Sequence, residues 1–145
     1  MNEEVTQPVD KDAAGSLATP ADTSLLDLAV LSRLDDDLGR ESVTDLLGLF
    51  RTESERRRCR IEAAVSARDS AAACHEAHAL KGSALTFGAC RLGELALKME
   101  QAGRRGDLDG LTSDLPELAR LTAETQTALV RLFSGSNDRC DPEST

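Results

Sequence analysis

Apolar residues recur at helical spacing along most of the chain, from about residue 24 to about residue 134. Intervals of three and four residues separate neighbouring apolar positions, whereas a half-buried strand would alternate apolar and polar residues. Leucine and alanine occupy most of these positions, and these residues favour helices over strands. The pattern therefore predicts an all-α fold.

Capping and turn residues divide the first half of this pattern into three predicted helices. The first begins at Ser24 with an approximate capping box and ends at Gly39. The second covers residues 40–67. Asp69 is expected to cap the third helix, which ends near residue 86.

The second half of the pattern predicts two further helices. One lies after Gly88 and ends before Gly103 and Gly106, and the other begins after Asp107. Pro116 is expected near the start of this last helix or at a kink. Four long amphipathic helices with short connections predict an antiparallel four-helix bundle, with the first helix as an additional N-terminal cap.

The two ends of the chain differ from the middle in composition. Residues 1–22 are rich in acidic residues, Ala, Thr and Pro, and both this segment and residues 135–145 are expected to be disordered tails. The predicted domain, residues 23–134, holds 18 acidic and 15 basic residues, although the whole chain has a net charge of −9. A nearly balanced domain lacks the basic stripe that nucleic-acid binding requires.

The chain has no sequence feature of a secreted or membrane-spanning protein. Its acidic N-terminus lacks the apolar run of a signal peptide, and no stretch approaches the roughly 20 apolar residues that span a bilayer. The four cysteines are spaced too widely for a CxxC pair and are expected to be reduced thiols. We therefore expect a cytoplasmic protein without membrane contact.

The third predicted helix carries the only two histidines of the chain, His75 and His78. On a helical wheel of about 100° per residue, the apolar residues of this helix lie opposite His78. Gly82 lies about 40° from His78 on one side, and Lys81 lies about 60° away on the other. A glycine inside a helix costs about 1 kcal/mol relative to alanine, so Gly82 indicates that something large approaches the imidazole. An exposed imidazole beside a cation and an open space suits a transient anion on the ring, such as a phosphoryl group.

Other interpretations of the same residues stay open on this reasoning alone. A lone surface histidine often has no function, and a glycine inside a helix often permits close helix packing. Cys74 and His78, four residues apart, could also bind zinc, although no second pair of ligands is evident.

The segment around His78 resembles the signature of histidine-containing phosphotransfer (HPt) domains. In that family His-x-x-Lys-Gly-Ser surrounds the phosphoacceptor histidine, and residues 77–84 of this chain read Ala-His-Ala-Leu-Lys-Gly-Ser-Ala. The likeness extends over residues 25–134. It includes Phe87-Gly88-Ala89, the Leu-Gly-Arg-Glu turn at 38–41, Leu46-Leu47-x-x-Phe50, Leu92-x-x-Leu95 and Lys98-Met99-Glu100.

The resemblance implies roles for the residues around the histidine. His78 would be the phosphoacceptor, Lys81 would steady the phosphoryl group, and Gly82 would make room for a docking receiver domain. Ser83 matches the motif, but it lies about 140° from His78 on the wheel, which argues against a direct role. The partner surface is expected to combine His78 with Leu85, Cys74 and Ser83.

Glu100 matches the position of a glutamine that orients the acceptor imidazole in some relatives. Its carboxylate could accept the proton of one ring nitrogen and leave the other nitrogen free as the nucleophile. A charged side chain exposed at a helix end fits the same residue equally well.

The implied function is reversible phosphoryl transfer between an aspartate of a receiver domain and His78, within a two-component phosphorelay. Response-regulator receiver domains or a hybrid sensor histidine kinase would be the partners of a monomeric carrier. The receiver is expected to bring Mg²⁺, and the chain itself is expected to need no cofactor or metal. It has no Gly-rich phosphate loop, so we expect a phosphocarrier rather than a kinase.

Two alternatives keep the same surface and change the function. One is a helical adaptor that binds a signalling partner without being phosphorylated. The other is a phosphate sink that drains a receiver domain by the same chemistry.

Overall fold

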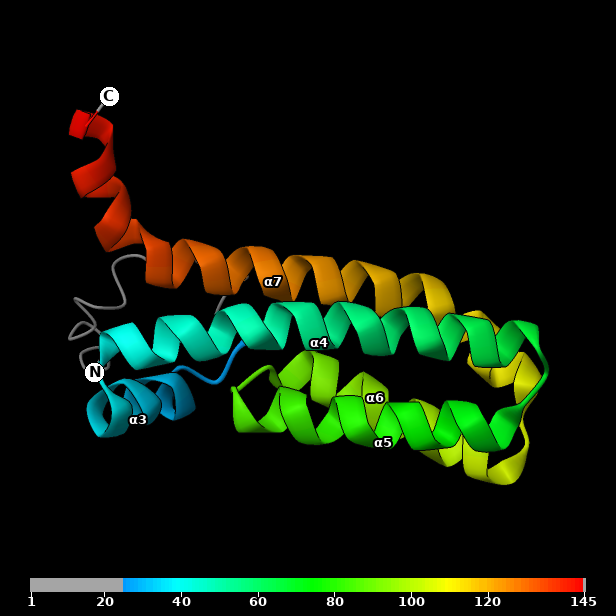
Figure 1. Ribbon diagram of the computed structural model, residues 1–145. Helices are drawn as coiled ribbons and strands as arrows, with labels where there is room; N and C mark the ends of the chain where they lie inside the picture. The colour runs from blue at the N-terminus through cyan, green and yellow to red at the C-terminus, as the bar shows by residue number, and fades with distance from the viewer. Residues whose placement is uncertain (1–24, 145) are drawn as a thin grey trace, which may run out of the picture.

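The computed structural model describes residues 25–144, and their side chains as far as residue 133 (Figure 1). Its helices are α3 (Leu28–Leu38), α4 (Arg40–Ser66), α5 (Ser70–Thr86), α6 (Cys90–Arg105) and α7 (Leu108–Ser144). No strand occurs between residues 25 and 144, so the predicted all-α class is confirmed.

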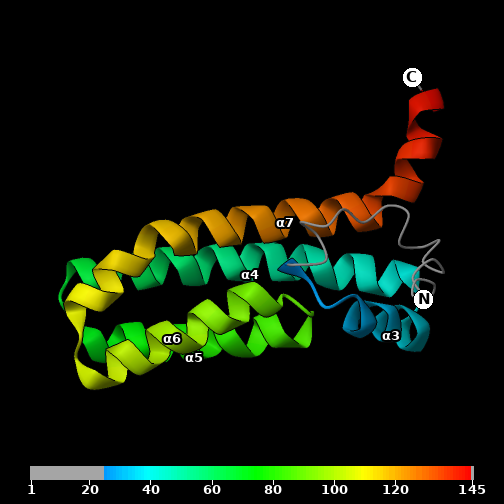
Figure 2. The same cartoon turned by 180° about the vertical axis from the view of Figure 1, so that it is seen from behind.

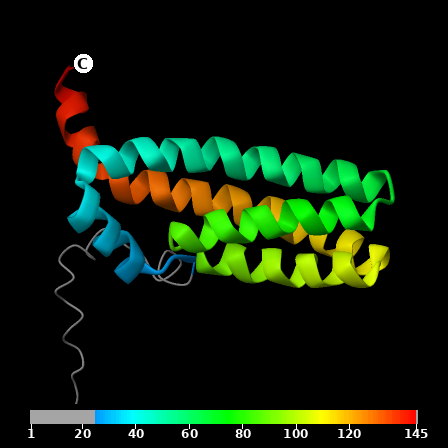
Figure 3. The same cartoon turned by 60° about the horizontal axis from the view of Figure 1, so that its bottom comes forward.

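The four long helices α4 to α7 lie side by side (Figures 1 and 3). Helix α5 packs against α4 and α6, and α7 packs against the same two helices. Helix α3 packs against α4 at one end of the molecule (Figure 2). This arrangement leaves one side of α5 free of helix neighbours, which matters for the site below.

The core between these helices consists mainly of leucine and alanine, with a few Val, Ile, Phe and Met side chains. Each fully buried leucine contributes about 2 kcal/mol of hydrophobic free energy. Alanines at 73, 77 and 84 are fully buried along one side of α5, where small side chains allow the neighbouring helices to come close. The largest fully buried side chains include Leu26, Ile61, Leu80, Leu92, Met99, Leu111, Leu118 and Leu129.

Helix boundaries agree with the predicted ones at several caps. Gly39 follows α3 with a φ of 90°, a conformation that favours glycine. The Asp69 carboxylate caps α5 by accepting a 3.0 Å hydrogen bond from the Ala72 backbone N–H. Helix α6 was expected to end before Gly103, but it continues to Arg105; Gly106, which follows it, has the left-handed φ of 73° that is common after a helix.

The predicted start of the first helix is wrong. Asp27 caps α3, because its carboxylate accepts hydrogen bonds from the backbone N–H groups of Ala29 and Val30. A carboxylate at this position also interacts favourably with the helix dipole, which helps to explain why the helix begins after Asp27. Ser24, the predicted cap, lies outside the described residues.

The segment before α3 is fastened to the turn between α5 and α6. The Asp27 N–H donates to the Gly88 carbonyl oxygen at 2.7 Å. The Cys90 thiol donates to the Leu25 carbonyl oxygen at 3.3 Å. Gly88 has a φ of +72°, and a Cβ there would lie 2.9 Å from the Asp27 carbonyl oxygen. Glycine is therefore required here for both backbone conformation and space.

Helix α7 is longer than predicted. Its backbone continues to Ser144, although residues 135–145 were expected to be a tail. A helix that has already formed extends at little cost, so its backbone need not end where its packed face ends. Pro116 lies inside α7 rather than in its first turn, and the tail predicted for residues 1–22 lies outside the described residues.

None of the described helices is long and apolar enough to cross a membrane.

Candidate functional site

His78 lies on the free side of α5. Its side chain is 65% exposed, whereas Ala77 and Leu80, on the opposite side of the helix, are fully buried. The helical wheel predicts this orientation, because the continuous apolar face of the helix lies opposite His78. The imidazole is therefore accessible to a partner molecule.

Gly82 leaves an open space one turn after His78. A Cβ at this position would meet no atom within 4 Å beyond the local backbone. The alternative explanation, that Gly82 permits close packing of another helix, is therefore wrong. The missing side chain clears a surface beside the imidazole.

Glu100 connects α6 to His78. Its Oε2 lies 2.9 Å from the Nδ1 of His78, and its side chain is only 6% exposed. The alternative of an exposed charge at a helix end is therefore wrong. A carboxylate accepts hydrogen bonds and cannot donate them, so the contact favours the tautomer with its proton on Nδ1. The other ring nitrogen, Nε2, then keeps a free lone pair.

Close packing of the two helices explains how Glu100 reaches the ring. Gly103 lies one turn further along α6, where a Cβ would come within 2.9 Å of the Cys74 backbone nitrogen and the Ser70 carbonyl oxygen. Only glycine allows the two backbones to approach so closely at this point. The close approach carries the nearby Glu100 carboxylate into the contact between the helices.

Two cations hold the Glu100 carboxylate from different helices. Lys81 on α5 places its Nζ 2.8 Å from Oε1, and Arg104 on α6 donates from Nη2 to Oε2 at 2.9 Å. The Lys81 ammonium is the main cause that lowers the pKa of Glu100 to about 2; burial opposes this effect, and the bond with His78 adds to it. Glu100 is therefore ionised at neutral pH.

Arg104 was not predicted as a site residue. Glu100 and Arg104 are four residues apart, which is the spacing at which opposite charges pair along a helix. This spacing is visible in the sequence and could have indicated the pair. Lys81, which was expected to reach toward a group on His78, instead contacts Glu100 in the unphosphorylated protein.

The three residues predicted to contact a partner differ in accessibility. Leu85 is 52% exposed and lies over α6, where a Cβ on Gly93 would come within 2.7 Å of its Cδ2. Cys74 is half-buried beside Gly103, and Ser83 is also half-buried. Of the three, Leu85 therefore offers the most exposed apolar surface, while Cys74 faces the contact with α6.

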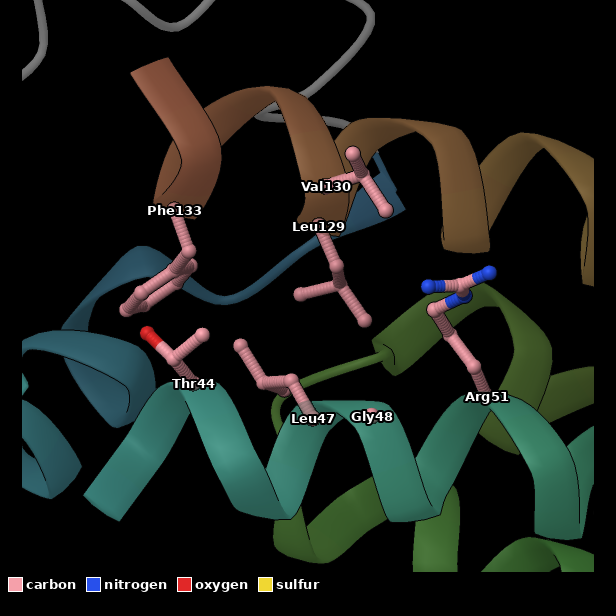
Figure 4. A pocket seen from close by; sticks show the side chains of 7 residues that line it. All are labelled: Thr44, Leu47, Gly48, Arg51, Leu129, Val130 and Phe133. Carbon is pink, nitrogen blue, oxygen red and sulfur yellow. The ribbon is translucent and has the colours of Figure 1, made fainter. Parts of the chain in front are cut away.

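The rest of the described chain offers no second candidate site that includes these residues. A pocket between α4 and α7 contains none of the predicted site residues (Figure 4); it is lined by Thr44, Leu47, Gly48, Arg51, Leu129, Val130 and Phe133. Within the described part of the chain, no three His, Cys, Asp or Glu side chains gather so that they could hold a metal ion. The Cys74 and His78 pair thus has no third such ligand there.

Two comparisons with known proteins find relatives of this chain. The family model described as "Hpt domain" matches residues 45–132, which include His78, Lys81, Gly82 and Glu100. The crystal structure of histidine-containing phosphotransfer protein B from Pseudomonas aeruginosa is 30% identical in sequence, with a TM-score of 0.71. The match covers 79% of this chain and 96% of that one. No curated protein matches the chain.

Proposed function

This chain belongs to the histidine-containing phosphotransfer family, and we propose that it carries a phosphoryl group on His78 between receiver domains of a phosphorelay. The observation that carries the proposal is an exposed imidazole whose Nδ1 is bound by a buried, ionised carboxylate. A ring held in this way presents Nε2 to the solvent as a nucleophile that needs no general base.

The proposed reaction is an in-line transfer. The Nε2 lone pair attacks phosphorus on the receiver's phosphoaspartate, and the bond from phosphorus to the aspartate oxygen breaks. Catalysis of this kind depends on positioning and on neutralising the charge of the transferred group. Glu100 positions the ring, and Lys81 lies close enough to contribute positive charge. Mg²⁺ and an acidic pocket would come from the receiver domain.

Gly82 supports the proposal that a whole protein domain docks at this site. The open space beside His78 would allow the receiver's active site to reach the ring, and Leu85 would add apolar contact. Cys74 and Ser83, being half-buried, would contribute at the edge of the docking surface.

We take the framework to be an antiparallel four-helix bundle of α4 to α7 capped by α3, within a domain that spans residues 23–134. The protein would act as a cytoplasmic monomeric carrier rather than as a kinase, with response regulators or a hybrid sensor kinase as its partners.

Phosphate transfer from a labelled receiver domain tests the proposal. Incubation with a phosphorylated receiver should move acid-labile label to the wild type, and His78→Gln should accept none. His75→Gln is the matched control, because it removes the only other histidine, three residues away on the same helix. This control should accept label at the wild-type rate.

Two results would contradict the proposal. Label that never reaches the wild type would favour the adaptor, which binds the receiver without phosphorylation. Equal labelling of His78→Gln and the wild type would show that the phosphoryl group sits elsewhere. A sink and a relay intermediate differ in a second step, since only the relay passes label from His78 to another receiver.

A further inference from the structure

The charges around His78 are unusual for a group that must hold an anion. The side chain that binds Nδ1 of the ring is a carboxylate, and Lys81 and Arg104 both contact that carboxylate. A neutral amide in the place of Glu100 would have oriented the imidazole without bringing a negative charge. The carboxylate must therefore affect the phosphorylated ring in a way that an amide would not.

We infer that Glu100 makes phospho-His78 a short-lived and ready donor, because the carboxylate keeps Nδ1 protonated while the phosphoryl group is on Nε2. The inference rests on the proposed function, since it concerns the phosphorylated form of His78. Glu100 acts here as a positioning residue for the ring proton and does not contact phosphorus.

The chemistry follows from the state of the ring when the N–P bond breaks. When Nδ1 carries a proton, the ring of the phosphohistidine is positively charged, and it departs as neutral imidazole. The unprotonated ring would have to depart as imidazolate, which is a far poorer leaving group. A carboxylate 2.9 Å from Nδ1 stabilises the cationic ring through a charge-assisted hydrogen bond.

The transfer step balances without movement of the ring proton. A receiver aspartate oxygen forms a bond to phosphorus, the N–P bond breaks, and its electron pair stays on Nε2. The proton remains on Nδ1, so the ring changes from a cation to neutral imidazole. In hydrolysis, water replaces the aspartate as the nucleophile, and its proton passes to the solvent or the released phosphate.

Replacing Glu100 with a neutral residue would also change how the neighbouring groups act on the phosphorylated ring. These groups are Lys81 and the exposed His75 on α5, and Arg104 on α6. Without the carboxylate, the two cations would disfavour a positive ring and would be free to pair with the phosphoryl oxygens. Both effects lengthen the lifetime of phosphohistidine.

Two charged side chains on the remaining helices pair with charges on α5 and α6. Arg57 on α4 contacts Glu76 on α5 at 2.6 Å. Lys98 on α6 contacts Asp114 on α7 at 3.2 Å. The charged groups that contact the ring or its carboxylate are Glu100, Lys81 and Arg104.

The experiment measures the lifetime of phosphohistidine in the full chain. Phosphoramidate serves as the phosphoryl donor, so that no partner protein is needed, and phosphorus NMR follows hydrolysis between pH 6 and pH 9 after the donor is removed. The proteins are wild type, Glu100→Gln and the control Glu94→Gln. Glu94 is an exposed carboxylate on the same helix, so its replacement makes the same change in net charge.

Wild type and Glu94→Gln should hydrolyse at rates that change little between pH 6 and pH 8. The phosphohistidine of Glu100→Gln should hydrolyse about tenfold more slowly at pH 8. The substitution replaces a charge-assisted hydrogen bond with a neutral one, and the difference in strength between the two corresponds to a factor of about ten. The variant's return of phosphate to an unphosphorylated receiver should slow by a similar factor.

The outcomes separate this inference from the proposed function. The inference is overturned if the wild type is phosphorylated and the phosphohistidine of Glu100→Gln hydrolyses as fast as that of the wild type, or faster, at pH 8. The carrier function would still stand in that case. Failure of both phosphoramidate and a receiver to phosphorylate His78 overturns both. If Glu100→Gln does not fold, the wild type alone decides, because a hydrolysis rate that falls steeply from pH 6 to pH 8 contradicts a carboxylate-held proton.

Discussion

Two glycines of the α5–α6 region lie in opposite surroundings. Gly82 on α5 faces open space, whereas Gly103 on α6 lies against the backbone of Cys74 and Ser70. The first leaves room for a molecule that arrives from outside, and the second lets two helices of the same chain touch. The comparison teaches that a glycine inside a helix can mark a docking surface or a packing contact, and that only the neighbouring helix distinguishes them.

The packing role of Gly103 predicts the largest effect. Gly103→Ala places a Cβ within 2.9 Å of backbone atoms that cannot move independently, and should lower the free energy of unfolding by about 2 kcal/mol. Urea denaturation measures this change. Gly48→Ala is the matched control, because Gly48 lies inside α4 with nothing within 4 Å, and this variant should be slightly more stable. Equal stability of the two variants would contradict the distinction.

The docking role of Gly82 predicts the next effect. Gly82→Leu fills the open space beside His78 and should slow phosphoryl acceptance from a receiver about tenfold, or about 1.4 kcal/mol in activation free energy. Circular dichroism and urea denaturation should show an intact fold. Gly48→Leu, far from the site in sequence and on another helix, should transfer normally. An unchanged rate for Gly82→Leu would remove the docking role.

Alanine at the same position separates stability from function. Gly82→Ala should raise the free energy of unfolding by about 1 kcal/mol, because glycine is the poorer helix former and no atom opposes the new Cβ. Such a gain would mean that this glycine costs stability in the folded protein. A loss of stability in urea denaturation would instead assign Gly82 to packing, as for Gly103.

The smallest effect is expected at Lys81. Lys81→Ala removes a cation near the phosphoryl group and should shorten the lifetime of phosphohistidine about threefold, a change typical of a partly exposed ion pair. This sign is opposite to that expected for Glu100→Gln. A lifetime and a transfer rate that both stay at the wild-type values would argue against the role of Lys81.

The same substitution has a consequence for pH dependence. Because Lys81 is the main cause of the low pKa of Glu100, Lys81→Ala should raise that pKa above about 2. The contribution of ionised Glu100 to stability is present above its unfolded pKa and is lost as the pH falls through the folded one. In the variant this contribution should therefore be smaller, and its loss should be complete at a higher pH; carboxyl-carbon NMR titration can measure the raised pKa of Glu100.

Features that are decided within one helix were predictable from the sequence. The exposed position of His78, the cap at Asp69 and the end of α3 at Gly39 depend on residue spacing along a single element. A helical wheel and the capping rules describe these relations directly.

Features that are decided between helices were less predictable. Gly103 was expected at a helix end, because glycine often follows an apolar stripe, yet α6 continues to Arg105. Spacing alone left the burial of Glu100 open, and only the family resemblance suggested its contact with His78. These features depend on how far α6 is shifted along α5, which neither helix specifies by itself.

The fastening of Asp27 to Gly88 and of Cys90 to Leu25 has a consequence for engineering chimeric signalling proteins. The family match begins at residue 45. A fragment that begins there would lack the segment before α3 that is hydrogen-bonded to the turn between α5 and α6. The two helices that this turn joins carry His78 and Glu100. A transplantable unit should therefore begin no later than Leu25, well before the first residue that the family match covers.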